Sequence, residues 1–378
     1  AAIIVWPQSR HFDVLCSAGV SHALAGLRMM VGHLRTARTS ERERLKQQCQ
    51  SFAAAVLSHW PERMYATSYG PADGERDDLL ELLLDLDSLP LLKGYMQLVL
   101  ARDVEQRPGP ALLRACDRHG WSVFSADLLR LFEATSKAAI ERNAHVLETL
   151  SLKPELDQAQ RGVACELATR LLSALERVDD ESNERASAST AAARCVLLTS
   201  LLKAFIAIAE SRLLGELVGY IQRAVERHPL RTVQVPVLVA LSAWIREPSH
   251  AAVEPLLKWL RACLCELQAS TEHEPAAPSD WRRASELSCN CDNCKKLSGF
   301  LDDPKTQTTR IAAREDVRRH VQAVISGDRC DLSCHTEKRG RPYTLVCTKN
   351  DASYRRALAT YESDQVDLSK LRTIHSAW

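Results

Sequence analysis

The feature that most limits the fold of this chain is a nearly continuous succession of helical segments from about residue 10 to residue 268. Apolar residues in these segments recur at spacings of three and four, as they do on one face of an α-helix. In residues 39–60, for example, Cys49, Phe52 and Val56 share one face. Segments of this kind bury their apolar faces by packing helix against helix. The chain is therefore expected to be mainly α.

The composition agrees with a helical fold. Aromatic residues make up only 5% of the 378 residues and glycines number 14, so the chain is poor in the residues that strands and tight turns favour. No signature recurs with a period of 34 to 47 residues, as repeat arrays require. Two arrangements stay open on these grounds, an irregular helical bundle and an α-solenoid-like array.

A polar segment containing Pro275 and Pro278 ends the helical succession. Prolines among small polar residues are typical of a linker. We therefore predict a helical scaffold domain at residues 1–270, a linker at 271–280, and a small Cys/His-rich module with a C-terminal helix at 281–378.

Net charge and hydropathy limit which kinds of partner, and which cellular compartment, we expect for this protein. The formal net charge is +1, which gives no general attraction to nucleic acid or to anionic membranes. No run approaches the roughly 18 uninterrupted apolar residues of a membrane span, and the N-terminus lacks a signal-peptide pattern. The 13 cysteines are an odd number, and many lie in helical segments where a reduced thiol acts as a small apolar side chain. We expect an intracellular protein, cytoplasmic or nuclear, without a disulfide framework. Because the sequence starts with Ala, we also expect it to be a piece of a longer protein.

Three cysteines gather within the segment SCNCDNCKKL at residues 288–297. Cys291 and Cys294 have the two-residue spacing at which two thiolates bind one tetrahedral zinc ion. Residues 314–326 read as a helix presenting His320, and Cys334 falls on the first strand of a predicted β-hairpin. We predict Cys291, Cys294, His320 and Cys334 as the ligands of one zinc ion. The alternates for the last places are Cys289, Cys330 and His335.

Two other interpretations of the cysteines stay open. They could be reduced thiols in a small core, or a redox dithiol, although the Cys-x-x-Cys here lacks the βαβ context of thioredoxin-like motifs. Four protein ligands would leave no open position on the metal, so a zinc ion here would be structural and would not activate water.

The segments CDNCKKLSGFLDDP, RRHVQAVI and RGRPYTLVCTKN together resemble the C-terminal region of large fungal and bacterial proteins with an N-terminal 2-oxoglutarate/Fe(II) oxygenase domain of the prolyl 4-hydroxylase type. The resemblance covers about residues 288–350. It implies that the catalytic domain of the parent protein lies outside this chain.

The oxygenase iron site itself is not expected here. His11-Phe12-Asp13 matches the His-x-Asp motif of such a site. It lies at the start of a helical segment, however, and no alternating strands follow that could build a barrel. The resemblance therefore assigns no oxygenase residue in this sequence. The sequence also contains no phosphate-binding glycine loop and no nucleophile motif.

The sequence thus predicts a non-catalytic helical scaffold with a structural zinc module, an interaction or regulatory region whose partner is another protein or the rest of the parent chain. One alternative is a nucleic-acid-binding module that uses Lys338, Arg339 and Arg341 at the hairpin turn, with Tyr343 to stack on a base. Another is an accessory part of a 2-oxoglutarate/Fe(II) dioxygenase. No membrane partner is expected.

Overall fold

The computed structural model describes residues 11–60, 74–100, 110–133, 136–151, 153, 156–181, 188–245, 254–283 and 285–378. The chain divides into two compact units. The first, which we call the helical unit, comprises Ala1–Cys263 together with Ile374–Trp378. The second, the sheet unit, comprises Leu264–Thr373. The division falls inside helix α13 (Glu254–Ser270), upstream of the predicted linker, and residues 271–280 contain neither helix nor strand.

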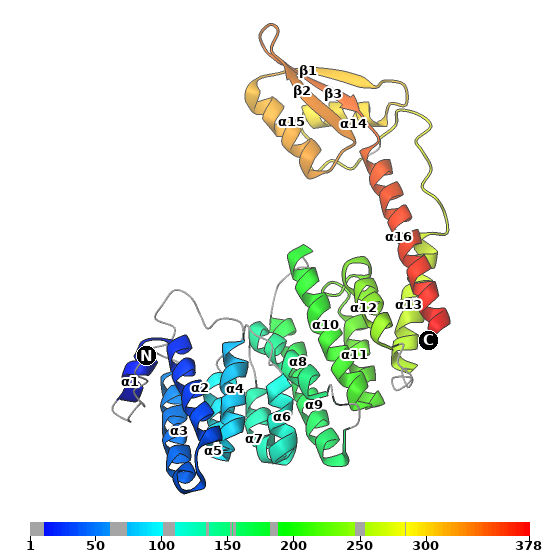
Figure 1. Ribbon diagram of the computed structural model, residues 1–378. Helices are drawn as coiled ribbons and strands as arrows, with labels where there is room; N and C mark the ends of the chain where they lie inside the picture. Colours follow the sequence, from blue (N-terminus) through cyan, green and yellow to red (C-terminus); the bar gives the residue numbers. More distant parts are fainter. Residues whose placement is uncertain are drawn as a thin grey trace. The chain divides into compact units, whose positions relative to one another are not determined.

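The helical unit is a two-layer array (Figure 1). In one layer, each helix contacts the next helix of the same layer. Its members are α2 (Val20–Thr36), α4 (Glu75–Leu86), α6 (Pro110–His119), α8 (Lys137–Ser151), α10 (Ala188–Ile208) and α12 (Val235–Ile245). The other layer follows the same rule. It consists of α1 (Phe12–Ser17), α3 (Thr39–His59), α5 (Leu89–Tyr95), α7 (Trp121–Leu131), α9 (Gln158–Glu181) and α11 (Ser211–Arg223). Helix α5 continues into the π-helical η2 (Met96–Leu100), which contacts α7.

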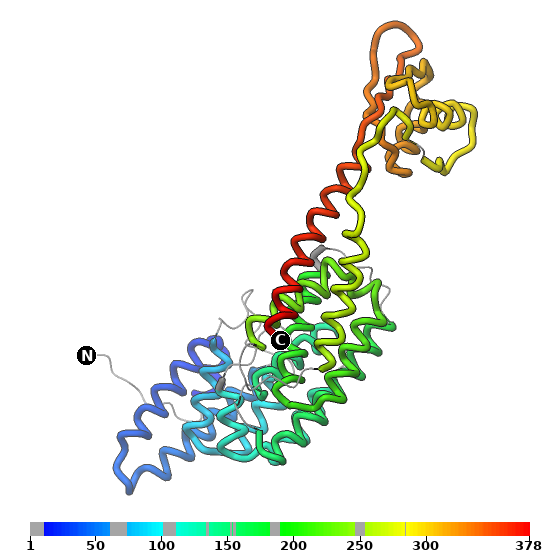
Figure 2. Tube along the Cα trace, turned by 90° about the vertical axis from the view of Figure 1, so that its right-hand side faces the viewer, coloured from blue at the N-terminus to red at the C-terminus, as the bar shows by residue number. Residues whose placement is uncertain are grey.

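This arrangement decides between the two predicted architectures in favour of the solenoid-like array. Successive helices alternate between the layers and stack side by side (Figure 2). The predicted face of α3 is the buried one, since Cys49, Phe52 and Val56 are all inaccessible to solvent. A single helix cannot bury its own apolar face, so most of its stability comes from its neighbours in the stack.

Among the described residues, one helix is long and apolar enough to cross a membrane by length and composition. It spans Thr190–Ile208 in α10, and 56% of its apolar window is buried inside the structure. It packs against α8, α11 and α12, and against the π-helical turn η3 (Leu230–Gln234). The core helix of a soluble protein passes the same test, so this single segment is weak support for a membrane span.

A buried polar cluster joins the last helices of the array. Asp179 of α9 is 4% exposed and accepts two hydrogen bonds from the Arg194 guanidinium, at 2.9 and 2.7 Å, and one from the Tyr220 hydroxyl. The His228 ring lies edge-on to Tyr220, with 5.2 Å between ring centroids, and its Nδ1 is 3.3 Å from the carbonyl oxygen of Ile221. Its buried Nε2 has no hydrogen-bond partner among the described residues. Burial lowers the pKa of His228 to about 4.

The sheet unit places two helices on one face of a small antiparallel sheet (Figure 1). The strand order is β1-β3-β2, and the core contains Leu297, Phe300, Val321, Ile325 and Leu345. The elements are α14 (Asp292–Asp302), β1 (Thr308–Ala312), α15 (Glu315–Gly327), β2 (Leu332–Glu337), β3 (Thr344–Lys349) and α16 (Ala352–Ala377). The last residues of α16, from Ile374 on, belong to the helical unit. The predicted hairpin is confirmed as β2 and β3, and β1 is an additional strand at the other edge of β3.

Lys349, on the inner face of β3, is 2% exposed. Its Nζ donates to the carbonyl oxygen of Asp303 at 2.6 Å and lies 4.4 Å from the centre of the Phe300 ring. Burial lowers the pKa of this amine, and the carbonyl and the ring face offset part of the cost of burying its charge. Lys349 thereby joins β3 to the end of α14.

Candidate metal centre

Four possible ligand side chains come from two segments of the sheet unit. Cys289 and Cys291 belong to the extended segment before α14, Cys291 is the residue that precedes the helix, and Cys294 lies in its first turn. His320 lies in the middle of α15. Asp328, at the end of α15, accepts hydrogen bonds from the backbone N–H and the hydroxyl of Ser288, at 2.8 and 3.1 Å. The thiol segment is thus tied to the helix that carries the imidazole.

The four ligand atoms all lie within 4.8 Å of one another. The Nε2 atom of His320 is 3.3 Å from the sulfur of Cys289 and 3.5 Å from the sulfurs of both Cys291 and Cys294. In a tetrahedral site with Zn–S bonds of about 2.3 Å and a Zn–N bond of about 2.0 Å, nitrogen and sulfur are about 3.5 Å apart. The separations in the structure therefore match those around a single tetrahedral ion.

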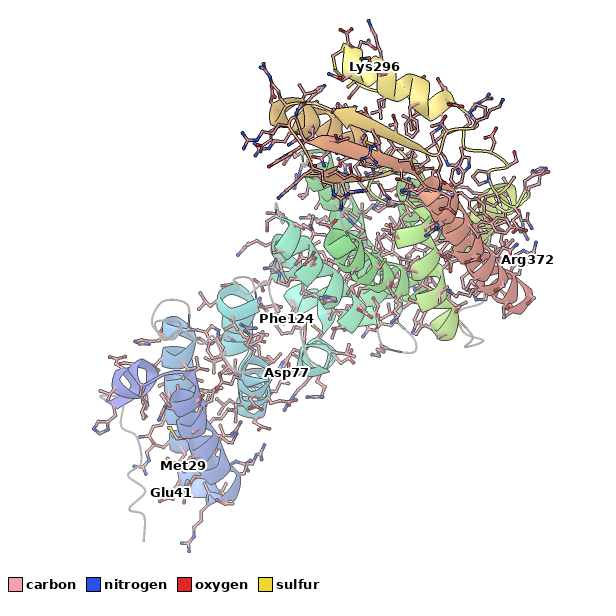
Figure 3. The ribbon with its side chains drawn as sticks, turned by 90° about the horizontal axis from the view of Figure 1, so that it is seen from above. Met29, Glu41, Asp77, Phe124, Lys296 and Arg372 are labelled. Carbon is pink, nitrogen blue, oxygen red and sulfur yellow. The ribbon has the colours of Figure 1, made fainter. Side chains whose placement is uncertain are left out.

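The electrostatics of the group favour a cation. Hydrogen bonding from Cys294, first through its backbone N–H, lowers the pKa of Cys291 to about 6, which makes this thiol easier to deprotonate than a free cysteine. Burial, followed by the neighbouring sulfurs Cys291 and Cys289, raises the pKa of Cys294 to about 12. All three sulfurs would be thiolates together only with a positive charge between them, such as that of a metal ion. Lys296, labelled in Figure 3, is on the exposed part of α14.

The structure brings together three of the four residues that were predicted as ligands. Cys291, Cys294 and His320 come together as expected, but Cys334 does not join them, because its side chain is on the inner face of the sheet, with its sulfur 3.2 Å from that of Cys347. The fourth member of the group is Cys289, which the sequence analysis named only as an alternate.

The other two alternates lie elsewhere. Cys330 is buried in the core of the sheet unit, and His335 is exposed on β2, one residue out of phase with the inward-facing Cys334. The Cys-x-Cys-x-x-Cys spacing was the signal for Cys289.

The structure also describes the His-x-Asp residues near the N-terminus and the basic residues of the hairpin turn. His11 and Asp13 lie at the start of a helix, as the sequence predicted, and the Asp13 carboxylate is 3.4 Å from Nε2 of His59. At the hairpin turn, Lys338, Arg339 and Arg341 are exposed. Tyr343 is half-buried, and the Arg318 guanidinium lies 5.4 Å from the centre of its ring.

The site is thus a Cys₃His group of the kind that holds a metal ion, and within the part of the chain that is described it is the one place where three or more such side chains converge. No family model, curated protein or solved structure matches the chain.

Proposed function

We propose that Cys289, Cys291, Cys294 and His320 bind one structural zinc ion. Thiolate and imidazole are the donors zinc prefers, and a tetrahedral arrangement of sulfur and nitrogen favours zinc over magnesium, calcium or manganese. The observation that carries the proposal is the agreement of the three nitrogen–sulfur separations with one tetrahedral centre. Four protein ligands fill the coordination sphere, so the ion would have a structural role.

A zinc ion would stabilise a part of the sheet unit that has little regular structure of its own. Its core is small, and the segment that carries Cys289 and Cys291 has neither helix nor strand to hold it. A metal bound by this segment, by α14 and by α15 would fasten all three together, and its binding free energy would add to the stability of the unit.

We further propose that the chain is a non-catalytic interaction or regulatory region of a larger protein. The two-layer helical array supports this role, since stacked helix pairs create extended surfaces for binding other proteins. The resemblance to oxygenase-containing proteins makes the rest of a parent chain one candidate partner. Turnover of 2-oxoglutarate by the purified chain with added iron would contradict the assignment.

The metal proposal is tested by elemental analysis of the purified chain. We expect one zinc per chain, and a fall in the unfolding temperature of the sheet unit when a chelator removes it. Cys291→Ser and His320→Ala should lower the bound zinc, whereas Cys265→Ser, which alters an exposed thiol in α13, should leave it unchanged. Less than one zinc per chain after dialysis against zinc, with the wild-type fold intact, would overturn the proposal.

A nucleic-acid-binding role is the second candidate, and the exposed Lys338, Arg339 and Arg341 favour it. The packing of Tyr343 against Arg318 limits stacking on a base. If the turn binds nucleic acid, binding of a single-stranded oligonucleotide should weaken steeply with salt and should be lost when all three residues become glutamine. A lack of binding at low salt would remove this candidate.

A further inference from the structure

A second pair of thiols lies in the sheet unit, apart from the Cys₃His group. Cys334 of β2 and Cys347 of β3 are direct register partners, and their sulfurs are 3.2 Å apart. An S–S bond is about 2.05 Å long, so the sulfurs would have to approach by only about 1.1 Å to form one.

The backbone hydrogen bonds show which kind of cross-strand pair this is. Asn350 N–H donates to the Asp331 carbonyl across the β2–β3 ladder, and Lys349 N–H donates to Gln307 on the β1 side, both at 2.9 Å. Hydrogen-bonded and non-hydrogen-bonded pairs alternate along an antiparallel ladder, so Cys334 and Cys347 form a non-hydrogen-bonded pair. The Cα atoms of such pairs are about 4.5 Å apart, which is within the range that a disulfide spans.

The pair has the features of a dithiol and lacks those of a metal site. A zinc or copper site needs further ligands, and no third metal-binding side chain joins these two sulfurs among the described residues. The two sulfurs also differ in access to solvent, since Cys334 is half-buried and Cys347 is fully buried. A reagent from solution therefore reaches Cys334 first.

We propose that Cys334 and Cys347 are a reversible disulfide site whose oxidant is a small-molecule disulfide such as oxidised glutathione. The Cys334 thiolate attacks one sulfur of the small disulfide, forms a mixed disulfide and releases one small thiolate. Cys347 then attacks the Cys334 sulfur, forms the cross-strand bond and releases the second small thiolate. The protein gives up two electrons, the small disulfide is reduced, and the two thiol protons end on the two small thiols.

Hydrogen bonding supports this order of attack. The Cys347 thiol lies against the Cys334 sulfur and lowers the pKa of Cys334, while the same contact raises the pKa of Cys347. The half-buried sulfur is thus the better thiolate and the buried one keeps its proton until the second step. Thiol–disulfide exchange runs in either direction, so an excess of the small thiol would reverse both steps.

The consequence would be local. The bond would join β2 to β3 and close a loop that contains the exposed Lys338, Arg339 and Arg341, so the hairpin turn would be held more rigidly in the oxidised protein. The inference does not depend on the zinc proposal, because none of the four metal ligands takes part in it.

The test is a redox titration of the full chain in glutathione buffers, followed by acid quenching, alkylation of free thiols and tryptic mapping. Trypsin should release residues 330–338, which contain Cys330 and Cys334, and residues 340–349, which contain Cys347. We expect these two peptides to be disulfide-linked in oxidising buffers and separate after reduction.

Two variants identify which sulfur of residues 330–338 forms the link to Cys347. Cys330→Ser should keep the link and Cys334→Ser should abolish it. The proposal is overturned if Cys334 and Cys347 both remain alkylatable in a buffer that glutathionylates the exposed Cys265 of the wild-type chain. It is equally overturned if the link persists in Cys334→Ser, which would assign it to Cys330.

Discussion

The buried His228 should make the helical unit sensitive to mild acid. Its imidazole is inaccessible to solvent, and its pKa in the folded chain is about 4, against 6.5 when exposed. Burial is the main cause. Arg194 and Arg227 also lower the pKa, and Asp179 and the Ile221 carbonyl oppose them. Because the folded pKa is the lower one, the unfolded chain takes up a proton below about pH 6.5 that the folded chain does not.

The expected loss of stability follows from the two pKa values. Above pH 7 the imidazole is neutral in both states and contributes almost nothing. Between pH 7 and pH 5, preferential protonation of the unfolded chain should lower the free energy of unfolding by about 2 kcal/mol. The loss approaches roughly 3 kcal/mol as the pH falls through the folded pKa, and then levels off.

Urea unfolding at pH 7, 6 and 5 measures this effect. In a Trp281→Phe background, tryptophan fluorescence reports on the helical unit, because every other tryptophan belongs to it. The matched variant is His228→Asn, whose amide can still donate to the Ile221 carbonyl but does not titrate. We expect the stability difference between parent and variant to change by about 2 kcal/mol from pH 7 to pH 5. If the two proteins lose stability in parallel, His228 is not the source of acid sensitivity.

Two further predictions concern buried charges. Asp179→Asn removes the negative charge that faces Arg194 and should lower the free energy of unfolding of the helical unit by about 3–5 kcal/mol. Asp180→Asn, at an exposed carboxylate, should change it by less than about 0.5 kcal/mol. Equal effects in urea unfolding would contradict this reasoning. Lys349→Met keeps most of the side-chain volume but leaves the Asp303 carbonyl without its donor, so it should destabilise the sheet unit by about 1–3 kcal/mol. Faster amide exchange along β3, absent in the exposed control Lys305→Met, would show the loss, and unchanged exchange would refute it.

The sequence predicted the helical architecture because periodic apolar faces are a local property. Cys49, Phe52 and Val56 are buried as expected, and the hairpin of β2 and β3 lies where its turn residues indicated. The choice between bundle and array depended on which helices contact each other. The sequence has no recurring signature from which these contacts could be predicted. The strand β1, TTRIA, was missed because its one large apolar residue, Ile311, gives no alternation, and its conformation comes from pairing with β3.

The Cys₃His group was partly predictable for a similar reason. Cys291 and Cys294 are close because of their spacing on a helix start, and His320 followed from the predicted helix. The fourth member of the group depended on tertiary geometry, since Cys334 and Cys289 were equally available as residue types. The register of β2 against β3 directs Cys334 towards Cys347, while the extended segment before α14 brings Cys289 to His320.

The spacing of the proposed ligands also has a consequence for synthesis of the chain. The three cysteines precede His320 by 31, 29 and 26 residues, so they leave the ribosome before the imidazole is available. During that interval a captured ion would have one coordination position open to water or to a foreign thiol. Loading of the correct metal would thus be completed only when α15 has emerged and folded back onto the nascent cysteine segment.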